Sequence, residues 1–141
     1  MRPAYRAGTR GWLLLPVAAL VLSGLAAGCS SSKPAYCTAA TDLKTSVSNL
    51  SNVDVAKNGL GSLQTALNSV QTNAKTFASD AKSAYPSQTT ALQNSLSSLE
   101  NAIKSAKGQS PLTAASAVLP AVTQVKNSAS SLESAASGKC S

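Results

Sequence analysis

The residues that could carry out chemistry are few and widely spaced. The chain has no histidine. Its five acids are Asp42, Asp54, Asp80, Glu100 and Glu133. No two of them lie three or four residues apart, which disfavours the paired carboxylates of a glycosidase. Ser79 and Lys82 have the spacing of a serine nucleophile with a lysine base, but we interpret them as solvated surface. The sequence therefore predicts no catalytic residue and a protein that is not an enzyme.

Cofactor and nucleic-acid sites are not expected either. The three cysteines, Cys29, Cys37 and Cys140, form no Cys-x-x-Cys pair and have no histidine to complete a metal site. A glycine-rich phosphate loop is missing. Aromatic residues make up only 4% of the chain, which disfavours base stacking. We expect no metal, no cofactor and no nucleic acid.

Residues 1–28 have the three zones of a secretory signal peptide. Residues 1–11 contain three arginines and no acid, residues 12–27 are mostly apolar, and small residues precede Cys29. A transmembrane helix is the alternative. The sixteen residues of this apolar zone span about 24 Å as a helix, short of the roughly 30 Å hydrocarbon core, and no basic stop-transfer cluster follows. We therefore expect cleavage before Cys29.

The segment Leu25-Ala26-Ala27-Gly28-Cys29 resembles the lipobox of bacterial lipoprotein precursors. The resemblance implies that Cys29 becomes a lipidated N-terminus, with acyl chains such as palmitate, on the outer face of the cytoplasmic membrane. The position three before the cysteine, usually leucine, is alanine here. Small residues there also suit an ordinary signal peptidase, and the alternative is a freely secreted chain.

Lipidation of Cys29 leaves Cys37 and Cys140 as disulfide partners at the two ends of the folded region. Export places them in a compartment that permits disulfides. The bridge closes a loop of about 100 residues, for which chain-entropy models give about 4.7 kcal/mol.

Removal of the leader changes the charge balance. The full chain carries +7, and all three arginines precede Cys29, so nine lysines and five acids leave +4. We divide the chain into a signal peptide (1–28), a tether (29–36) and one small domain (37–141).

Apolar residues of the domain recur at alternating steps of three and four, which indicates helices. The four runs cover residues 40–50, 60–84, 92–106 and 112–136. The last run contains Leu112, Ala115, Leu119, Val122, Val125, Ala129, Leu132 and Ala136. No stretch alternates with a period of two, so the sequence predicts an all-α domain.

Turn residues separate the runs. Gly108 is expected to close the third helix in a left-handed conformation, Ser110 to cap the fourth, and Pro111 to begin it. Tyr85-Pro86-Ser87 is expected to end the second helix, because the residue before a proline disfavours helical angles, and Gly138 is expected to close the last.

Two segments are less regular. We expect residues 51–61 to form a loop with some helical character. Pro120 lies within the fourth helix, where it removes a hydrogen bond and is expected to bend the axis.

Four helices with short connections predict an antiparallel four-helix bundle closed by the terminal disulfide. An even number of antiparallel helices returns Cys140 to the end where Cys37 lies. An odd number would separate them by about 30 Å, whereas a disulfide needs Cα atoms roughly 4.4–6.8 Å apart.

Two heptads of the chain are similar in sequence. Asn94-Ser95-Leu96-Ser97-Ser98-Leu99-Glu100 is similar to Asn127-Ser128-Ala129-Ser130-Ser131-Leu132-Glu133. Duplication of a helical unit is one explanation. We prefer chance, because the chain is rich in serine, alanine and leucine.

The stretch from Cys37 through Val70 resembles small envelope lipoproteins of high-GC Gram-positive bacteria. The similarity rests on Asp42-Leu43-Lys44, Ser46-Val47, Leu50, Asn52-Val53 and Gly61-Ser62-Leu63, with a closing cysteine like Cys140. It implies the location and the fold, and no particular activity.

These observations indicate a non-catalytic, lipid-anchored envelope module that contacts another envelope protein or a wall polymer. The short tether implies that the end of the bundle opposite Cys37 faces outward, where loop residues usually recognise partners. The expected polar contacts are Asp54, Lys57, Asn58 and Gln109. The alternative is a carrier that binds a small ligand or lipid between its helices, with Phe77 lining a cavity above roughly 300 Å³ and Pro120 as a hinge.

Overall fold

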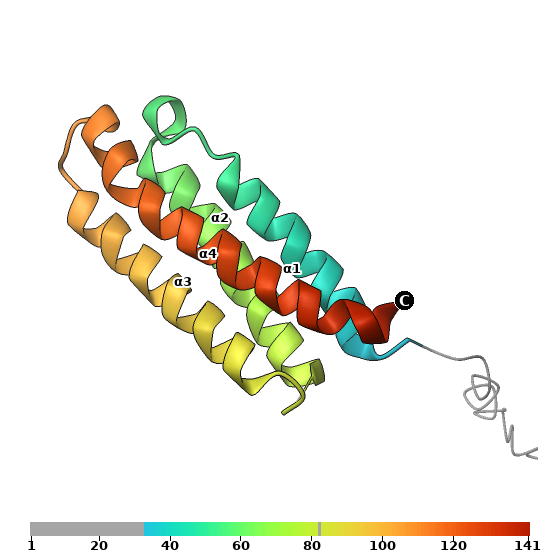
Figure 1. The fold of residues 1–141 in the computed structure, drawn as a ribbon. Coiled ribbons are helices and arrows are strands. Elements are labelled where there is room, and N and C mark those ends of the chain that lie inside the picture. Colours follow the sequence, from blue (N-terminus) through green and yellow to red (C-terminus); the bar gives the residue numbers. More distant parts are fainter. Residues whose placement is uncertain (1–32, 82) are drawn as a thin grey trace, which may run out of the picture. The chain divides into compact units, whose positions relative to one another are not determined.

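The structure, a computed structural model, describes residues 33–81 and 83–141. Within these ranges it contains four helices and no strand: α1 (Ala35–Ser51), α2 (Val55–Ala81), α3 (Pro86–Ala106) and α4 (Pro111–Cys140). The helices lie side by side as a helical bundle (Figure 1). The prediction of an all-α domain with four helices is confirmed. The signal peptide, Cys29 and Lys82 lie outside the described residues.

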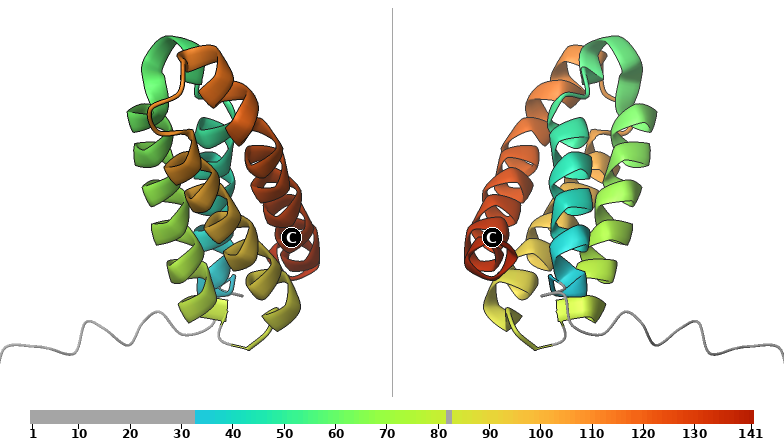
Figure 2. Two further views of the ribbon diagram at one scale, coloured as in Figure 1. Left: turned by 90° about the vertical axis from the view of Figure 1, so that its left-hand side faces the viewer. Right: turned by 90° about the vertical axis from the view of Figure 1, so that its right-hand side faces the viewer.

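Helices that follow each other along the chain pack together, and α4 also contacts α1 and α2. The α1–α2 and α3–α4 connections, residues 52–54 and 107–110, lie at one end, which we call the loop end (Figure 2). The start of α1 and the end of α4 lie at the other end, which we call the disulfide end because these two helix ends contain Cys37 and Cys140.

The predicted disulfide is present. Cys37 and Cys140 are bonded with their Cα atoms 5.5 Å apart. The bridge joins the first turn of α1 to the last residue of α4. Because α1 begins at Ala35, the last two residues assigned to the tether are helical.

The core at the disulfide end is aromatic. Phe77 is fully buried, and its ring centroid lies 6.0 Å from those of Tyr36 and Tyr85. The two tyrosine rings are 5.5 Å apart and meet edge to face. The space that Phe77 lines has a volume of only about 10 Å³. Phe77 is therefore a packed core residue.

The predicted apolar face of α4 is correct in its second half and wrong in its first. Leu112 and Leu119 are 74% and 63% exposed, whereas Ala114 and Val118 are buried. The expected series steps back by three residues twice in succession, from Val125 to Val122 and from Val122 to Leu119. Two steps of three fall short of two full helical turns, so Leu119 lies on a different side of the helix from the core residues. A step of four from Val122 selects Val118 instead.

Three of the predicted helix ends agree with the structure. Gly108 has a φ of 83°. The Ser110 side chain accepts a hydrogen bond from the Thr113 backbone N–H at 3.4 Å, and Pro111 is the first residue of α4.

Two predicted ends are wrong. α2 ends at Ala81, and Pro86 instead begins α3, a position where its missing N–H has no intrahelical partner to lose. Gly138 lies inside α4, which continues to Cys140. The disulfide holds this last turn against α1, and a glycine inside a helix costs only about 1 kcal/mol.

The segment expected to be a loop is largely helical. Only residues 52–54 separate α1 from α2, and Gly59, with a φ of 76°, interrupts α2 after its first turn. Asp54 begins that turn, because its Oδ1 accepts a hydrogen bond from the Lys57 backbone N–H at 3.1 Å. α4 continues through Pro120.

Candidate interaction furrow

Three grooves follow one another along the line where α1 faces α4. The groove at the loop end, about 270 Å³, lies between residues 53–56 and the first half of α4. The middle groove, about 400 Å³, shares Ser51 with it. The groove at the disulfide end, about 250 Å³, shares Lys44 and Glu133 with the middle one. We call this row of three grooves the α1–α4 furrow.

Small side chains account for the depth of the furrow. Ala40 of α1 and Ala129 and Ala136 of α4 line it where larger residues would fill the space. The larger residues of the same helices, such as Leu43 and Leu132, are buried in the core. The furrow floor is therefore apolar and its depth follows from alanine at the line of contact.

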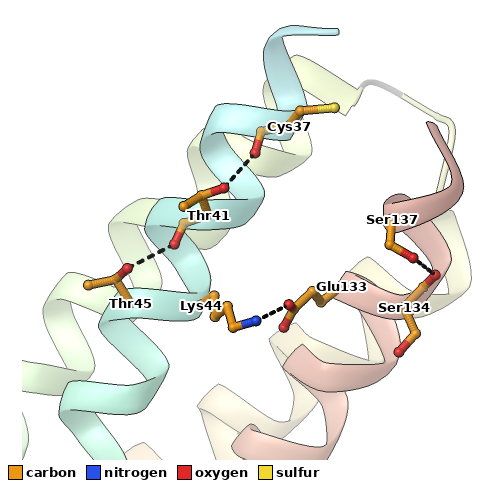
Figure 3. Close-up of polar contacts among 7 residues, drawn as sticks. All are labelled: Cys37, Thr41, Lys44, Thr45, Glu133, Ser134 and Ser137. Carbon is orange, nitrogen blue, oxygen red and sulfur yellow. Dashed lines mark hydrogen bonds and ion pairs between the residues drawn. The ribbon is translucent and has the colours of Figure 1, made fainter. Parts of the chain in front are cut away.

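A single ion pair crosses the furrow. Lys44 Nζ of α1 lies 2.5 Å from Glu133 Oε1 of α4, and both side chains are substantially exposed (Figure 3). Exposed ion pairs contribute at most about 1 kcal/mol, so this pair restrains the furrow only weakly. The neighbouring hydroxyls of Thr41 and Thr45 donate to backbone carbonyls of their own helix (Figure 3). Their donors are therefore already used within α1.

The remaining charges of the furrow differ in whether they have an ion-pair partner. Asp54, in the groove at the loop end, pairs with Lys57 at 3.5 Å. Lys126, in the middle groove, has no ion-pair partner among the described residues. Residues 108–125 of the chain carry no charge at all. Both acids of the furrow are thus compensated, and one lysine is left over.

Exposed leucines extend the furrow at the loop end. Leu112 and Leu119 are seven residues apart on α4, which places them on the same side of the helix. Leu119 and the half-buried Ala115 form one wall of the groove, opposite Val53 and Ala56. The two leucines are the large apolar side chains that the described residues expose most.

The structure brings only one of the four expected partner contacts into the furrow. Asp54 lines it, whereas Lys57, Asn58 and Gln109 line none of its three grooves. The Asn58 carbonyl accepts from Ser62 Oγ at 3.1 Å, and Gln109 Nε2 donates to the Ser105 carbonyl at 3.3 Å. The Gln109 side chain is therefore bonded within its own part of the chain, whereas the bond at Asn58 uses only its backbone carbonyl.

Sequence reasoning missed Leu119 and Lys126 as furrow residues. The signal that could have found them is the seven-residue spacing of Leu112, Leu119 and Lys126, which gives α4 a second face beside its core face. No sequence signal indicated the contribution of α1, because that depends on which helices become neighbours.

The rest of the described surface gives less support for an interaction site. A further groove of about 450 Å³ between α2 and α3 is lined by polar side chains that include Lys75, Gln93 and Glu100. The hydrogen bond from Lys104, at 2.7 Å, lowers the pKa of the Glu100 carboxyl. This pair links successive turns of α3 and needs no ligand.

The described residues hold no group of three or more cysteines and acids that could bind a metal ion. None of the helices in residues 33–141 is long and apolar enough to cross a membrane.

Comparison with known proteins assigns no family: the sequence matches no protein-family model and no curated protein, and no solved structure matches this fold.

Proposed function

We propose that this protein is a non-catalytic, lipid-anchored module of the cell envelope, related to the small lipoproteins of high-GC Gram-positive bacteria that it resembles. The observation that carries the proposal is the α1–α4 furrow, an open depression with an apolar floor and polar edges, which has the exposed Leu119 in its wall at the loop end. Exposed apolar side chains beside a groove with polar edges are a feature of many interaction sites.

The fold proposed for this module is an antiparallel four-helix bundle. Contacts between successive helices and the short connections between them support this arrangement. The disulfide from the start of α1 to the end of α4 supports it independently, because four helices return the chain to its starting end.

The proposed anchor is a lipid on Cys29. It rests on the charged, apolar and small-residue zones of residues 1–28 and on the lipobox resemblance. Cys29→Ala tests it. The wild type should take up a fatty-acid analogue and remain with the membrane, whereas the variant should take up none and should be secreted or left as precursor. Uptake by the variant would contradict the proposal.

The proposed orientation places the loop end away from the membrane. The five residues between Cys29 and Ala35 span at most about 18 Å, so the disulfide end stays near the anchor. Asp54, Lys57, Asn58 and Gln109 would then face outward. An epitope inserted after Gln109 should be accessible to antibody on intact cells, and one inserted after Pro86 should not. Equal accessibility at both sites would contradict this orientation.

A carrier function has less support. A ligand bound between the helices needs an internal cavity, and the space beside Phe77 is about 10 Å³. The two larger grooves, about 400 and 450 Å³, lie on the surface and are lined largely by polar side chains. An interaction module accounts for open grooves more directly than a carrier does.

A further inference from the structure

We propose that the α1–α4 furrow binds an amphipathic helix of a partner protein, with apolar residues on the furrow floor and an acidic residue beside Lys126. This inference rests on the proposed function as an interaction module and identifies the partner by its chemistry. It is carried by three features: the shape of the furrow, its apolar floor, and one lysine without an ion-pair partner among the described residues.

The shape of the furrow suits a helix. Its lining residues on α4 run from Ala115 to Cys140, which corresponds to about 38 Å of helix. The disulfide joins α1 and α4 at one end, so the depression exists before a partner arrives. Preformed grooves between helices are a recurring site for amphipathic helices.

The apolar lining calls for an apolar partner face. Val47, Ala129 and Val122 line the floor, and Leu119 forms a wall at the loop end. A helix with apolar residues at steps of three and four would cover this strip along its length. A hydrophilic wall polymer would leave Leu119 exposed to water.

The charges indicate that the partner is acidic. The furrow acids Glu133 and Asp54 each have a lysine partner, at 2.5 and 3.5 Å. Lys126 has none among the described residues and lies on the same side of α4 as Leu112 and Leu119. An acidic side chain on the partner helix would complete this pairing, and complementary charge also favours correct orientation.

A second copy of this chain fits the furrow less well. The mature chain carries nine lysines against five acids, so two copies repel each other. The exposed side of α4 between residues 108 and 125 also has no acid with which to pair Lys126 of another copy.

The test uses the full chain, purified from membrane or medium, whichever contains it, so that a failure of anchoring does not affect the result. The probes are three synthetic helices of equal length: an acidic amphipathic peptide, its basic counterpart with the same apolar face, and a scrambled acidic peptide. Fluorescence anisotropy measures the Kd of each. We expect the acidic amphipathic peptide to bind at least about tenfold more tightly than the other two.

Matched variants locate the binding. Lys126→Glu and Leu119→Ser should each weaken binding of the acidic amphipathic peptide by about fivefold or more. Lys75→Glu, the same charge change in the α2–α3 groove, should leave the Kd within about twofold. Circular dichroism of each variant checks that it is folded, and both furrow positions are exposed enough to accept these changes.

Several outcomes would overturn the inference. Equal binding of the basic or scrambled peptide would contradict the charge or the helical pattern. Equal weakening by Lys75→Glu would mean that net charge, not the furrow, attracts the peptide. A concentration-dependent dimer that Leu119→Ser dissolves would assign the furrow to a second copy. Binding to anionic lipid vesicles that requires Leu119, without peptide binding, would assign it to a lipid surface.

Discussion

Ser95 of α3 and Ser128 of α4 lie with their Oγ atoms 2.7 Å apart, and they occupy the same position in the two similar heptads. Ser95 is buried, and its Oγ also donates to the Ala91 carbonyl at 2.9 Å. The two heptads therefore meet where α3 and α4 pack together. This contact gives the sequence similarity a structural setting, since small residues are needed at the same position on both sides of one interface.

The serine contact should contribute modestly to stability. We expect Ser128→Ala to lower the free energy of unfolding by about 0.5–1 kcal/mol, because Ser95 keeps its bond to Ala91. A double-mutant cycle with Ser95→Ala, measured by urea denaturation, should give a coupling of about 0.5 kcal/mol or more. A coupling of zero would mean that the two hydroxyls do not interact in solution.

The disulfide should provide a large part of the stability. Cys37 and Cys140 are separated by 103 positions, and removing both thiols with serine should cost roughly 3–5 kcal/mol. For a domain of this size the Tm should fall by at least roughly 10 °C. The comparison is Cys29→Ser, which changes the cysteine that precedes the four helices and should leave the Tm of the bundle unchanged. A small change in Tm for the double variant would show that helix packing alone holds the two ends together.

Two adjacent residues of α4 test its orientation in the core. Val118 is 1% exposed and Leu119 is 63% exposed. Val118→Ala should therefore destabilise the bundle by about 1–3 kcal/mol, because it leaves a cavity. Leu119→Ala should change stability by no more than about 0.5 kcal/mol. The reverse order, measured by urea denaturation, would restore the orientation that the sequence pattern suggested.

The α4 error shows what the sequence could and could not provide. Alternation of three and four predicted all four helices, and the apolar residues from Val125 to Ala136 are buried as expected. Between Leu112 and Val122 the sequence allows two apolar faces of the helix. One face contains Leu112 and Leu119, and the other contains Ala114 and Val118. Local sequence does not choose between them. The choice depends on contacts of α4 with α1 and α2, which are distant in sequence.

The furrow could not be predicted from the sequence either, because it also depends on contacts between helices that are distant in sequence. Its lining comes from α1, from residues 52–56, from Leu63 and from α4. Alanine at a helix contact has the same sequence pattern whether it packs closely or leaves a groove. The cysteine pair was predictable because it follows from residue count and compartment. Asp54 was found as a loop residue, but its place in the furrow depends on Leu119 opposite.

Glycines at two helix ends should respond differently to alanine. Gly108 has a φ of 83°, a conformation that costs a residue with a side chain roughly 1 kcal/mol or more. Gly108→Ala should lower the free energy of unfolding by about that amount. Gly138 is helical and has open space around it, so Gly138→Ala should be neutral or stabilise by up to about 1 kcal/mol. Equal destabilisation by both would contradict the two assigned conformations.

Tyr85 should titrate at an unusually high pH as long as Tyr36 is present. The Tyr85 hydroxyl donates a hydrogen bond to Tyr36 Oη at 3.4 Å. This bond, with a further effect of desolvation, raises the pKa of Tyr85 above its ordinary value of 10.0. The folded state therefore holds the proton more tightly than the unfolded state does. The resulting stability is complete below about pH 10 and is lost as the pH rises through the folded pKa.

Tyr36→Phe tests this relationship, because it removes the acceptor and keeps the ring that packs against Phe77. The third tyrosine of the chain is Tyr5, so the variant is measured after residues 1–28 are removed, when tyrosinate absorbance reports the titration of Tyr85 alone. We expect its pKa to be lower than that of Tyr85 in the wild type and closer to the ordinary value. Stability measured by urea denaturation should also fall less steeply above pH 10 in the variant than in the wild type. Tyr36→Ala is the comparison: it should weaken packing at neutral pH as well, whereas Tyr36→Phe should not. An unchanged or higher pKa of Tyr85 in Tyr36→Phe would show that the hydrogen bond between the two hydroxyls does not hold its proton.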